Sequence, residues 1–281
     1  MQSKRKIVLC ADDFGISEGV DEAIIDLLLM QRINATSCMA VSDIWPVEVK
    51  KLKRCLDQIR SPVQIGLHLT LTGRFTPRSA GFEPSCDGHY VSKEKLLWLG
   101  FSRQLDRGRI ETEITTQLAR FRAHFGAFPA FIDGHEHCHL FPGVREALFR
   151  VLRDKKIPGI WVRQCGRGAG VFRTLIAGGA KSAVLEYLSR KFVLLSKEIH
   201  TNQSFDGAYS YNRVPSQVEL VGHYQRFTRG LCEGGVVMCH PGVVDKRLER
   251  LDTLLGPREA EYGFLRSKAF ARLLQEENIE L

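Results

Sequence analysis

Short apolar runs alternate along this chain with longer segments whose apolar residues recur every three or four positions. Continuous short runs are typical of strands buried on both faces, whereas the longer spacing indicates helices that bury one face. The pattern predicts strands at residues 7–11, 35–41, 64–71, 131–139, 159–163 and 235–239, with a short terminal strand at 279–281. It predicts helices at residues 17–30, 45–59, 95–98, 110–125, 142–153, 180–192 and 216–231, then a helix, a loop and a helix.

This alternation predicts an α/β fold built on a parallel sheet. Because at least six strand–helix units follow one another, we expect a closed or partly open (β/α) barrel-like sheet rather than a doubly wound one. Such barrels reach about 200–250 residues as one domain, so we expect a single domain over residues 1–281. The pattern breaks at about residues 73–108, where glycine, proline and polar residues gather. An insertion after the carboxyl end of a strand is typical of a substrate lid.

The charge balance is basic without a concentrated cationic patch. Lys+Arg 40 against Asp+Glu 32 gives a formal net charge of +8, which can attract anionic partners. The basic residues are spread along the chain without interleaved aromatic residues, a pattern that favours a solvated surface over a nucleic-acid site. No glycine-rich phosphate-binding motif follows the first strand, which counts against a nucleotide cofactor. We therefore expect a small-molecule substrate and no nucleic acid, with a homodimer left open.

Cysteine placement and hydropathy indicate the compartment. The eight cysteines form no CxxC pair and mostly lie within apolar runs, at positions 10, 38, 55, 86, 138, 165, 232 and 239. Reduced, buried thiols of a cytoplasmic protein fit this pattern better than a disulfide framework. No apolar stretch approaches the ~20 residues that cross a membrane, and no signal peptide opens the chain. We expect a cytoplasmic protein without a transmembrane segment, with peripheral membrane contact left open.

Three histidines stand at alternate positions behind an apolar pair. If residues 131–139 are extended, strand periodicity places His135, His137 and His139 on one side, as a metal site requires. A helix would scatter them, because neighbours on a helix face lie three or four residues apart. Neutral imidazole nitrogens bind divalent cations well. The alternative is a solvated histidine cluster that follows a core strand.

Other polar residues end strands at the same predicted edge of the sheet. Asp12 and Asp13 end the first strand, His68 lies near the end of the third, and His240 ends the last long strand. The carboxyl ends of parallel strands form the ligand-binding face in barrels and open α/β sheets. Each residue alone has another explanation, as a helix cap, a core histidine or part of a turn. Together they predict one site.

Four ordered motifs give the chain a family resemblance. They are ADDFG at residues 11–15, GLHL at 66–69, DGHEHCH at 133–139 and HPG at 240–242. In order and spacing they resemble the YdjC-like carbohydrate deacetylases, which include chitooligosaccharide deacetylases and the hopanoid-associated HpnK-like proteins. The resemblance spans residues 5–245, with Cys10 where an asparagine is frequent and Cys138 inside the histidine motif. It implies a distorted TIM-type (β/α) barrel-like sheet, as in polysaccharide deacetylases.

The resemblance also implies roles for individual residues. The family holds one divalent metal ion, magnesium or zinc, through positions that match Asp13, His68 and His135. Asp12 would be the general base and His240 the general acid. The residues implied to orient ligands or to face the substrate are Asp133, His137, His139 and Arg163. His139 remains an alternative metal ligand. Arg163 is equally well interpreted as a surface residue.

The resemblance implies a metal-dependent hydrolase that removes N-acetyl groups from an amino-sugar-containing substrate, either an oligosaccharide or a glycolipid. One alternative is a metal-dependent phosphoesterase or amidohydrolase, because His-x-His strand ends serve those reactions as well. A non-catalytic carbohydrate-binding protein is another. We expect residues 73–108 and the polar segment 197–213 to determine specificity, although neither contains a pattern that identifies the sugar.

Overall fold

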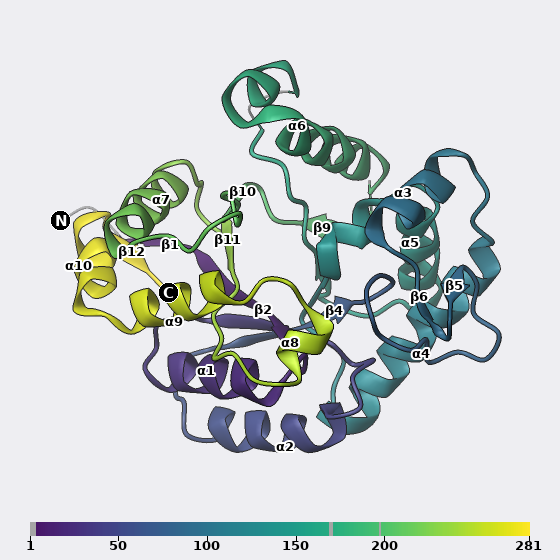
Figure 1. Cartoon of the computed structure of the whole chain (residues 1–281), viewed down its shortest axis with the longest axis horizontal. Coiled ribbons are helices and arrows are strands. Elements are labelled where there is room, and N and C mark those ends of the chain that lie inside the picture. Colours follow the sequence, from purple (N-terminus) through teal and green to yellow (C-terminus); the bar gives the residue numbers. More distant parts are fainter. Residues whose placement is uncertain (1–3, 169–170, 197) are drawn as a thin grey trace. The chain divides into compact units, whose positions relative to one another are not determined.

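Eight short strands form one parallel sheet (Figure 1). The computed structural model describes residues 4–168, 171–196 and 198–281, and the side chains of 171–182 lie outside that description. The strands are Val8–Phe14 (β2), Ala35–Cys38 (β3), Gln64–Leu69 (β4), Phe131–Gly134 (β7), Trp161–Val162 (β8), His200–Thr201 (β9), Phe205–Asp206 (β10) and Val236–Cys239 (β11). Their spatial order is β10-β11-β2-β3-β4-β7-β8-β9.

The predicted α/β class with a (β/α) barrel-like parallel sheet is confirmed. The strand pairs whose registers are known in this sheet are parallel, and such pairs need crossover connections, most of which are helices here. Within the described part of the chain, the outermost strands β10 and β9 are not paired with each other. The sheet is therefore open.

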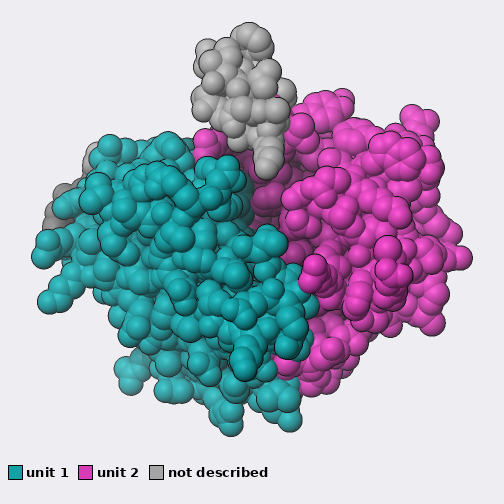
Figure 2. Space-filling view, viewed as in Figure 1, with its two compact units in different colours: residues 1–38, 47–65, 202–281 teal, residues 39–46, 66–201 magenta. Residues whose placement is uncertain are grey.

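The chain divides into two compact units, which Figure 2 colours separately. The first unit comprises Met1–Cys38, Val47–Ile65 and Asn202–Leu281. The second comprises Met39–Pro46 and Gly66–Thr201. Each unit has its own set of buried apolar side chains. Each can therefore be described by itself.

Helices and an aromatic cluster build the core of the first unit. Its helices include Glu18–Leu29 (α1), Gln217–Arg229 (α7), Leu248–Leu251 (α8), Gly256–Arg266 (α9) and Lys268–Glu276 (α10). The ring of Tyr224 on α7 lies 5.1 Å from that of Phe264 and 5.7 Å from that of Phe270. Aromatic pairs at these distances join α7, α9 and α10. The predicted terminal strand is confirmed as Ile279–Glu280 (β12), which pairs with Arg5–Lys6 (β1).

The second unit contains most of β4, all of β7 and β8 and, among its described residues, four α-helices. Its helices are Lys93–Phe101 (α3), Arg107–Phe125 (α4), Val144–Lys155 (α5) and Val171–Leu195 (α6), while Trp45–Leu56 (α2) belongs in part to each unit. A Cβ added at Gly66 of β4 would lie 2.4 Å from the ring of Phe131 on β7. That ring stacks on Trp161 at 4.6 Å. Glycine is therefore required at position 66, beside His68.

The insertion at residues 73–108 is tied to α4 by a buried carboxylate. It contains the hairpin Ser85–Cys86 (β5) and His89–Tyr90 (β6) and helix α3. Glu113 on α4 accepts hydrogen bonds from the insertion at 2.6 Å (Tyr90 Oη), 2.7 Å (Ser79 N and Oγ) and 3.1 Å (Arg78 N). Gln117, one turn along α4, donates to Glu113 and to the carbonyl of Thr70. The same carboxylate thus links the insertion to the end of β4.

Glu113→Gln is expected to destabilise the protein by about 2–4 kcal/mol at pH 7, because an amide cannot accept all of these bonds. Burial alone would raise the pKa of Glu113, but hydrogen bonds from Tyr90, Ser79 and Gln117 outweigh it and lower that pKa. A lowered pKa means that the contribution is complete above about pH 4.5 and is lost as the pH falls through the folded value. Urea unfolding from pH 7 to 4 checks this, with Glu111→Gln on the same helix as the control. A difference between wild type and Glu113→Gln that stays constant with pH would contradict it.

Two predicted strand boundaries are wrong. β2 continues through both aspartates to Phe14 rather than ending before them. The strand predicted over residues 131–139 ends at Gly134, and a short 3-10 helix, His135–Leu140 (η1), follows it. The polar segment 197–213, which had no predicted structure, contributes β9 and β10 among its described residues.

The cysteines and the helices bear on two further predictions. All eight cysteines are free thiols, six of them buried, with Cys86 and Cys232 exposed. Within the part of the chain that is described, we find no helix with the length and apolar character needed to span a bilayer.

Candidate active site

Adjacent carboxylates at the end of β2 begin the site. Asp12 and Asp13 are both 2% exposed. Asp13 has a left-handed φ of 70°, and the register of β2 against β3 shifts between Ala11 and Phe14. A left-handed residue other than glycine is uncommon and costs free energy, so it points to a functional constraint. Because the regular alternation of side chains is broken here, the two carboxylates need not face opposite sides of the sheet.

A buried arginine holds Asp13. Arg258 at the start of α9 places Nη2 2.6 Å from Asp13 Oδ2 and 2.6 Å from Asp252 Oδ2. Burial would lower the pKa of Arg258, but the charges of Asp13 and Asp252 outweigh it and raise that pKa. The guanidinium therefore stays charged. It engages Asp13 through Oδ2.

His68 belongs to a chain of buried charges in the second unit. The register of β4 and β7 pairs His68 with Asp133, and His68 Nδ1 lies 2.7 Å from Asp133 Oδ1. Asp133 Oδ2 lies 2.6 Å from Arg163 Nη2. A carboxylate at one ring nitrogen commonly fixes the orientation of a metal-binding histidine. The contact at Nδ1 makes Nε2 the nitrogen of His68 that suits a cation.

The predicted one-sided row of three histidines is wrong. After Gly134, Glu136 and His137 take left-handed φ values of 51° and 60° within η1. The chain therefore turns where extended backbone was expected, and strand alternation no longer applies. Lys93 of α3 pairs with Glu136 at 2.9 Å and holds this turn. The three imidazoles consequently have different surroundings.

His135 lies beside His68, with ring centroids 5.7 Å apart. The ring of Phe75 in the insertion meets the His135 ring edge to face, with centroids 6.3 Å apart. A Cβ added at Gly73 would lie 3.7 Å from His135 Nε2, and Gly73 has a φ of +84°. The start of the insertion thus lies against this imidazole.

His137 and His139 contact other groups. His137 Nδ1 lies 3.5 Å from Cys165 Sγ. His139 is fully buried, and its Nε2 lies 2.8 Å from the carbonyl oxygen of Arg163. Because a carbonyl only accepts, Nε2 of His139 carries the proton, and burial lowers the pKa of this histidine. His139 is thus neutral, and its Nε2–H donates to the backbone carbonyl of Arg163.

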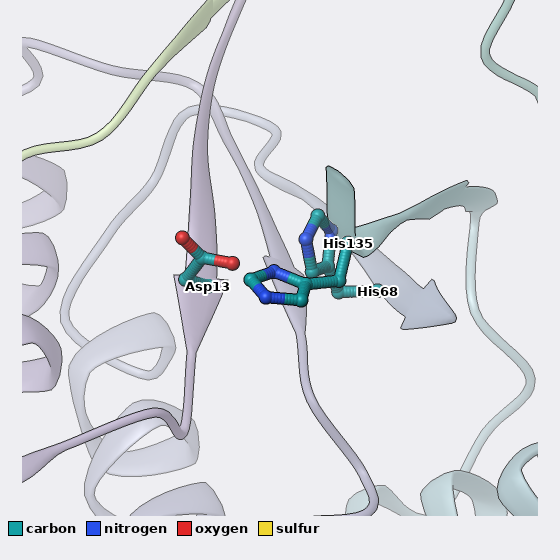
Figure 3. A group of neighbouring side chains, drawn as sticks. All are labelled: Asp13, His68 and His135. Carbon is teal, nitrogen blue, oxygen red and sulfur yellow. The ribbon is translucent and has the colours of Figure 1, made fainter. Parts of the chain in front are cut away.

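Asp13, His68 and His135 nevertheless form one group, which Figure 3 shows. Each offers a ligand atom, and these atoms lie within 4.8 Å of one another. One carboxylate with two imidazoles is a donor set that suits zinc and similar divalent cations. A second group of this kind contains Cys10, Asp12 and Asp133, all buried. The three residues predicted as ligands are thus brought together.

His240, the predicted general acid, follows β11 in the first unit. Tyr211 Oη lies 3.3 Å from its Nδ1. The backbone N–H of His240 donates to the buried carboxylate of Glu261 at 2.6 Å. Burial raises the pKa of Glu261, although its bond from His240 opposes this. Tyr211 lies 29 residues before His240, and Glu261 lies 21 residues after it. Because these contacts join separate segments, sequence patterns identified neither residue as a partner of His240.

Comparison with known proteins decides the family. The model of the YdjC-like protein family matches residues 6–276. The chain belongs to the YdjC-like family. The resemblance read from the four motifs is therefore confirmed.

Several curated members of the family are similar to this chain. The chain is 23% identical over 278 residues to a carbohydrate deacetylase of Clostridium beijerinckii, covering 98% of this chain and 97% of that protein. It is 32% identical over 159 residues to a carbohydrate deacetylase of Danio rerio, covering 54% of this chain and 48% of that protein. A chitooligosaccharide deacetylase of Yersinia pestis is 30% identical over 157 residues, covering 55% and 58%. The matches thus span about half of the Danio rerio and Yersinia pestis proteins and nearly all of the Clostridium beijerinckii protein.

A solved structure shares the fold. A protein of Enterococcus faecalis described as a "putative cellobiose-phosphate cleavage protein" matches with a TM-score of 0.76 and 18% identity, covering 99% of this chain and 97% of that one. At this identity the likeness concerns the fold alone. The shared fold covers nearly the whole length of the chain.

Proposed function

We propose that this YdjC-like chain is a metal-dependent hydrolase that removes N-acetyl groups from an amino-sugar-containing carbohydrate. The group of Asp13, His68 and His135 carries the proposal. One carboxylate and two imidazoles leave coordination positions for water and substrate, as catalytic metal sites require. The names of the relatives, carbohydrate deacetylase and chitooligosaccharide deacetylase, support the same activity.

Asp13, His68 and His135 would hold one divalent cation, magnesium or zinc. Such a cation, when bound, polarises an acyl oxygen and lowers the pKa of water. Asp133 orients His68 through Nδ1 at 2.7 Å, and Arg163 compensates the buried charge of Asp133 at 2.6 Å. Arg258 holds one oxygen of Asp13. The ligands are thus positioned by groups that the fold already orders.

Asp12 is the proposed general base. It is adjacent to Asp13 in sequence but lies outside the proposed ligand set, and it is 2% exposed. Its carboxylate accepts a bond from Ser37 Oγ at 3.4 Å. A buried carboxylate can take the proton of the attacking water. Asp12 therefore supplies the base without giving up a metal ligand.

His240 is the proposed general acid. When water attacks the acetyl carbon, the carbon–nitrogen bond breaks, and the leaving amine needs a proton. An imidazole suits this role because its ordinary pKa lies near neutrality. The products are acetate and a free sugar amine. His137 is left for substrate contact, whereas His139 and Arg163 support the site from within.

The proposed substrate, the segments that determine specificity and the location rest on the sequence patterns. The substrate is an oligosaccharide or a glycolipid, and residues 73–108 form a lid-like insertion on a single domain, with 197–213 as a second determinant of specificity. A cytoplasmic location is part of the proposal, and a homodimer is compatible with it.

Acetate release tests the proposed function. The wild-type protein, incubated with N-acetylated chitooligosaccharides and N-acetylglucosaminyl lipids, is expected to release acetate from at least one class. Chelation is expected to abolish this activity, and added magnesium or zinc to restore it. Release of phosphate from a phosphorylated disaccharide, without acetate release from any N-acetylated sugar, would favour a phosphoesterase instead.

A further inference from the structure

Tyr211 contacts the ring of His240 in two ways. Its hydroxyl oxygen lies 3.3 Å from His240 Nδ1, and the two rings meet edge to face with centroids 5.7 Å apart. The same hydroxyl donates to the carbonyl oxygen of Gly207 at 3.5 Å. A phenol has one proton to donate and lone pairs that accept. With its proton directed to Gly207, the Tyr211 oxygen can accept an Nδ1–H from His240.

Gly207 fixes the position of that carbonyl. It follows β10, has a φ of +121°, and a Cβ at this position would lie 2.3 Å from the carbonyl oxygen of Met238 on β11. Only glycine allows this approach and this conformation. Met238 lies two residues before His240 on the same stretch of chain. Gly207, the Tyr211 hydroxyl and His240 are therefore held against one strand.

We propose that Tyr211 is a positioning residue for His240: it accepts the Nδ1–H and so directs Nε2, the nitrogen that takes up and gives back a proton, toward the leaving amine. This inference rests on the proposed function for its catalytic meaning. The tautomer itself does not depend on that function. A neutral imidazole fixed as the Nδ1–H tautomer can take and return a proton only at Nε2.

Charged groups around Tyr211 keep its hydroxyl protonated. Burial raises the pKa of Tyr211, and the carboxylates of Glu261 and Asp12 raise it further, while Arg258 opposes them. The groups that face this pair of side chains are Glu261, which also accepts the His240 backbone N–H, Asp12, Cys239, Arg258 and Tyr209. Tyr211 thus acts as a neutral hydroxyl over the working pH range.

Tyr211→Phe keeps the ring contact and removes only the hydroxyl. Tyr224→Phe is the matched control, because Tyr224 is also a buried tyrosine of the first unit and its hydroxyl has no hydrogen-bond partner among the described residues. Nitrogen-15 NMR of the imidazoles reports which ring nitrogen carries the proton. His240→Asn identifies the His240 signals. We expect His240 to be the Nδ1–H tautomer in wild type and in Tyr224→Phe, and to shift toward the Nε2–H tautomer in Tyr211→Phe.

Kinetics on the metal-loaded protein separate positioning from packing. We expect Tyr211→Phe to lower kcat for acetate release about threefold to tenfold, the worth of one hydrogen bond, with KM nearly unchanged. The alkaline limb of the kcat profile should move to lower pH, because the protonated ring has lost an acceptor. Tyr224→Phe should keep both values.

An Nε2–H tautomer in wild type, or an unchanged tautomer in Tyr211→Phe, would overturn the proposal. So would an active wild type whose kcat and pH profile are the same in Tyr211→Phe. If the wild type releases no acetate, the proposed function fails, while the NMR result still decides whether Tyr211 orients His240.

Discussion

Asp12→Asn is expected to lower kcat for acetate release by about 10²- to 10⁴-fold, the usual contribution of a general base. The substitution keeps the shape of the side chain and removes only its ability to take a proton. Because Asp12 lies outside the group of Asp13, His68 and His135, the bound metal should remain. The loss should therefore appear in kcat, with little change in metal content.

Two measurements on the same preparation check this effect. Metal content by plasma mass spectrometry should match wild type, and acetate release should fall as stated. Asp57→Asn, an exposed carboxylate after α2, is the control for the chemical change itself. If Asp12→Asn kept full activity, Asp12 would not be the base. If it lost its metal, Asp12 would be a ligand.

His68→Ala is expected to lose both the metal and detectable acetate release. An alanine supplies no ligand, and two remaining protein ligands hold a divalent cation poorly. Asp133→Asn should have an intermediate effect, about a 10- to 100-fold weaker metal affinity, because Asp133 only orients His68 through Nδ1. The ranking of the two variants distinguishes a ligand from its supporting group.

Titration with zinc against a chelator of known affinity measures this series. His89→Ala is the matched control, because His89 is an exposed histidine on β6. Equal zinc affinity in wild type and His68→Ala would remove His68 from the ligand set. Equal affinity in Asp133→Asn and His68→Ala would show that Asp133 is as necessary as the ligand itself.

Strand pattern was sufficient to predict where Asp13 and His68 lie. Both occupy the carboxyl ends of buried parallel strands, and parallel strands bring such ends to one edge of a sheet. The pairing of His68 with Asp133 also follows from the register of β4 and β7. The sheet and the places of Asp13 and His68 on it are therefore consequences of local apolar runs.

The histidine motif shows where local pattern fails. Alternation predicts one side for His135, His137 and His139 only while the backbone stays extended. The left-handed φ values of Glu136 and His137 turn the chain directly after Gly134. Glycine adopts such a conformation far more readily than glutamate or histidine. His135 still lies beside His68 because it is the first residue after the strand.

The groups that support the site were not predictable from sequence. Arg258 lies 245 residues after Asp13 and resembles any other charged residue of a surface helix. Only tertiary packing buries it and joins it to Asp13. Tyr211 and Glu261 reach His240 in the same long-range way. Periodicity predicts elements, whereas these contacts depend on how distant elements pack.

The position of a bound cation tests the central claim most directly. Anomalous diffraction from crystals of the zinc-loaded protein locates zinc without assumption about its ligands. We predict one site, with Asp13, His68 and His135 as its protein ligands and zinc–nitrogen distances of about 2.0–2.1 Å. Zinc bound only elsewhere, for example at His137 and Cys165, or no ordered zinc in a protein that releases acetate, would contradict the account.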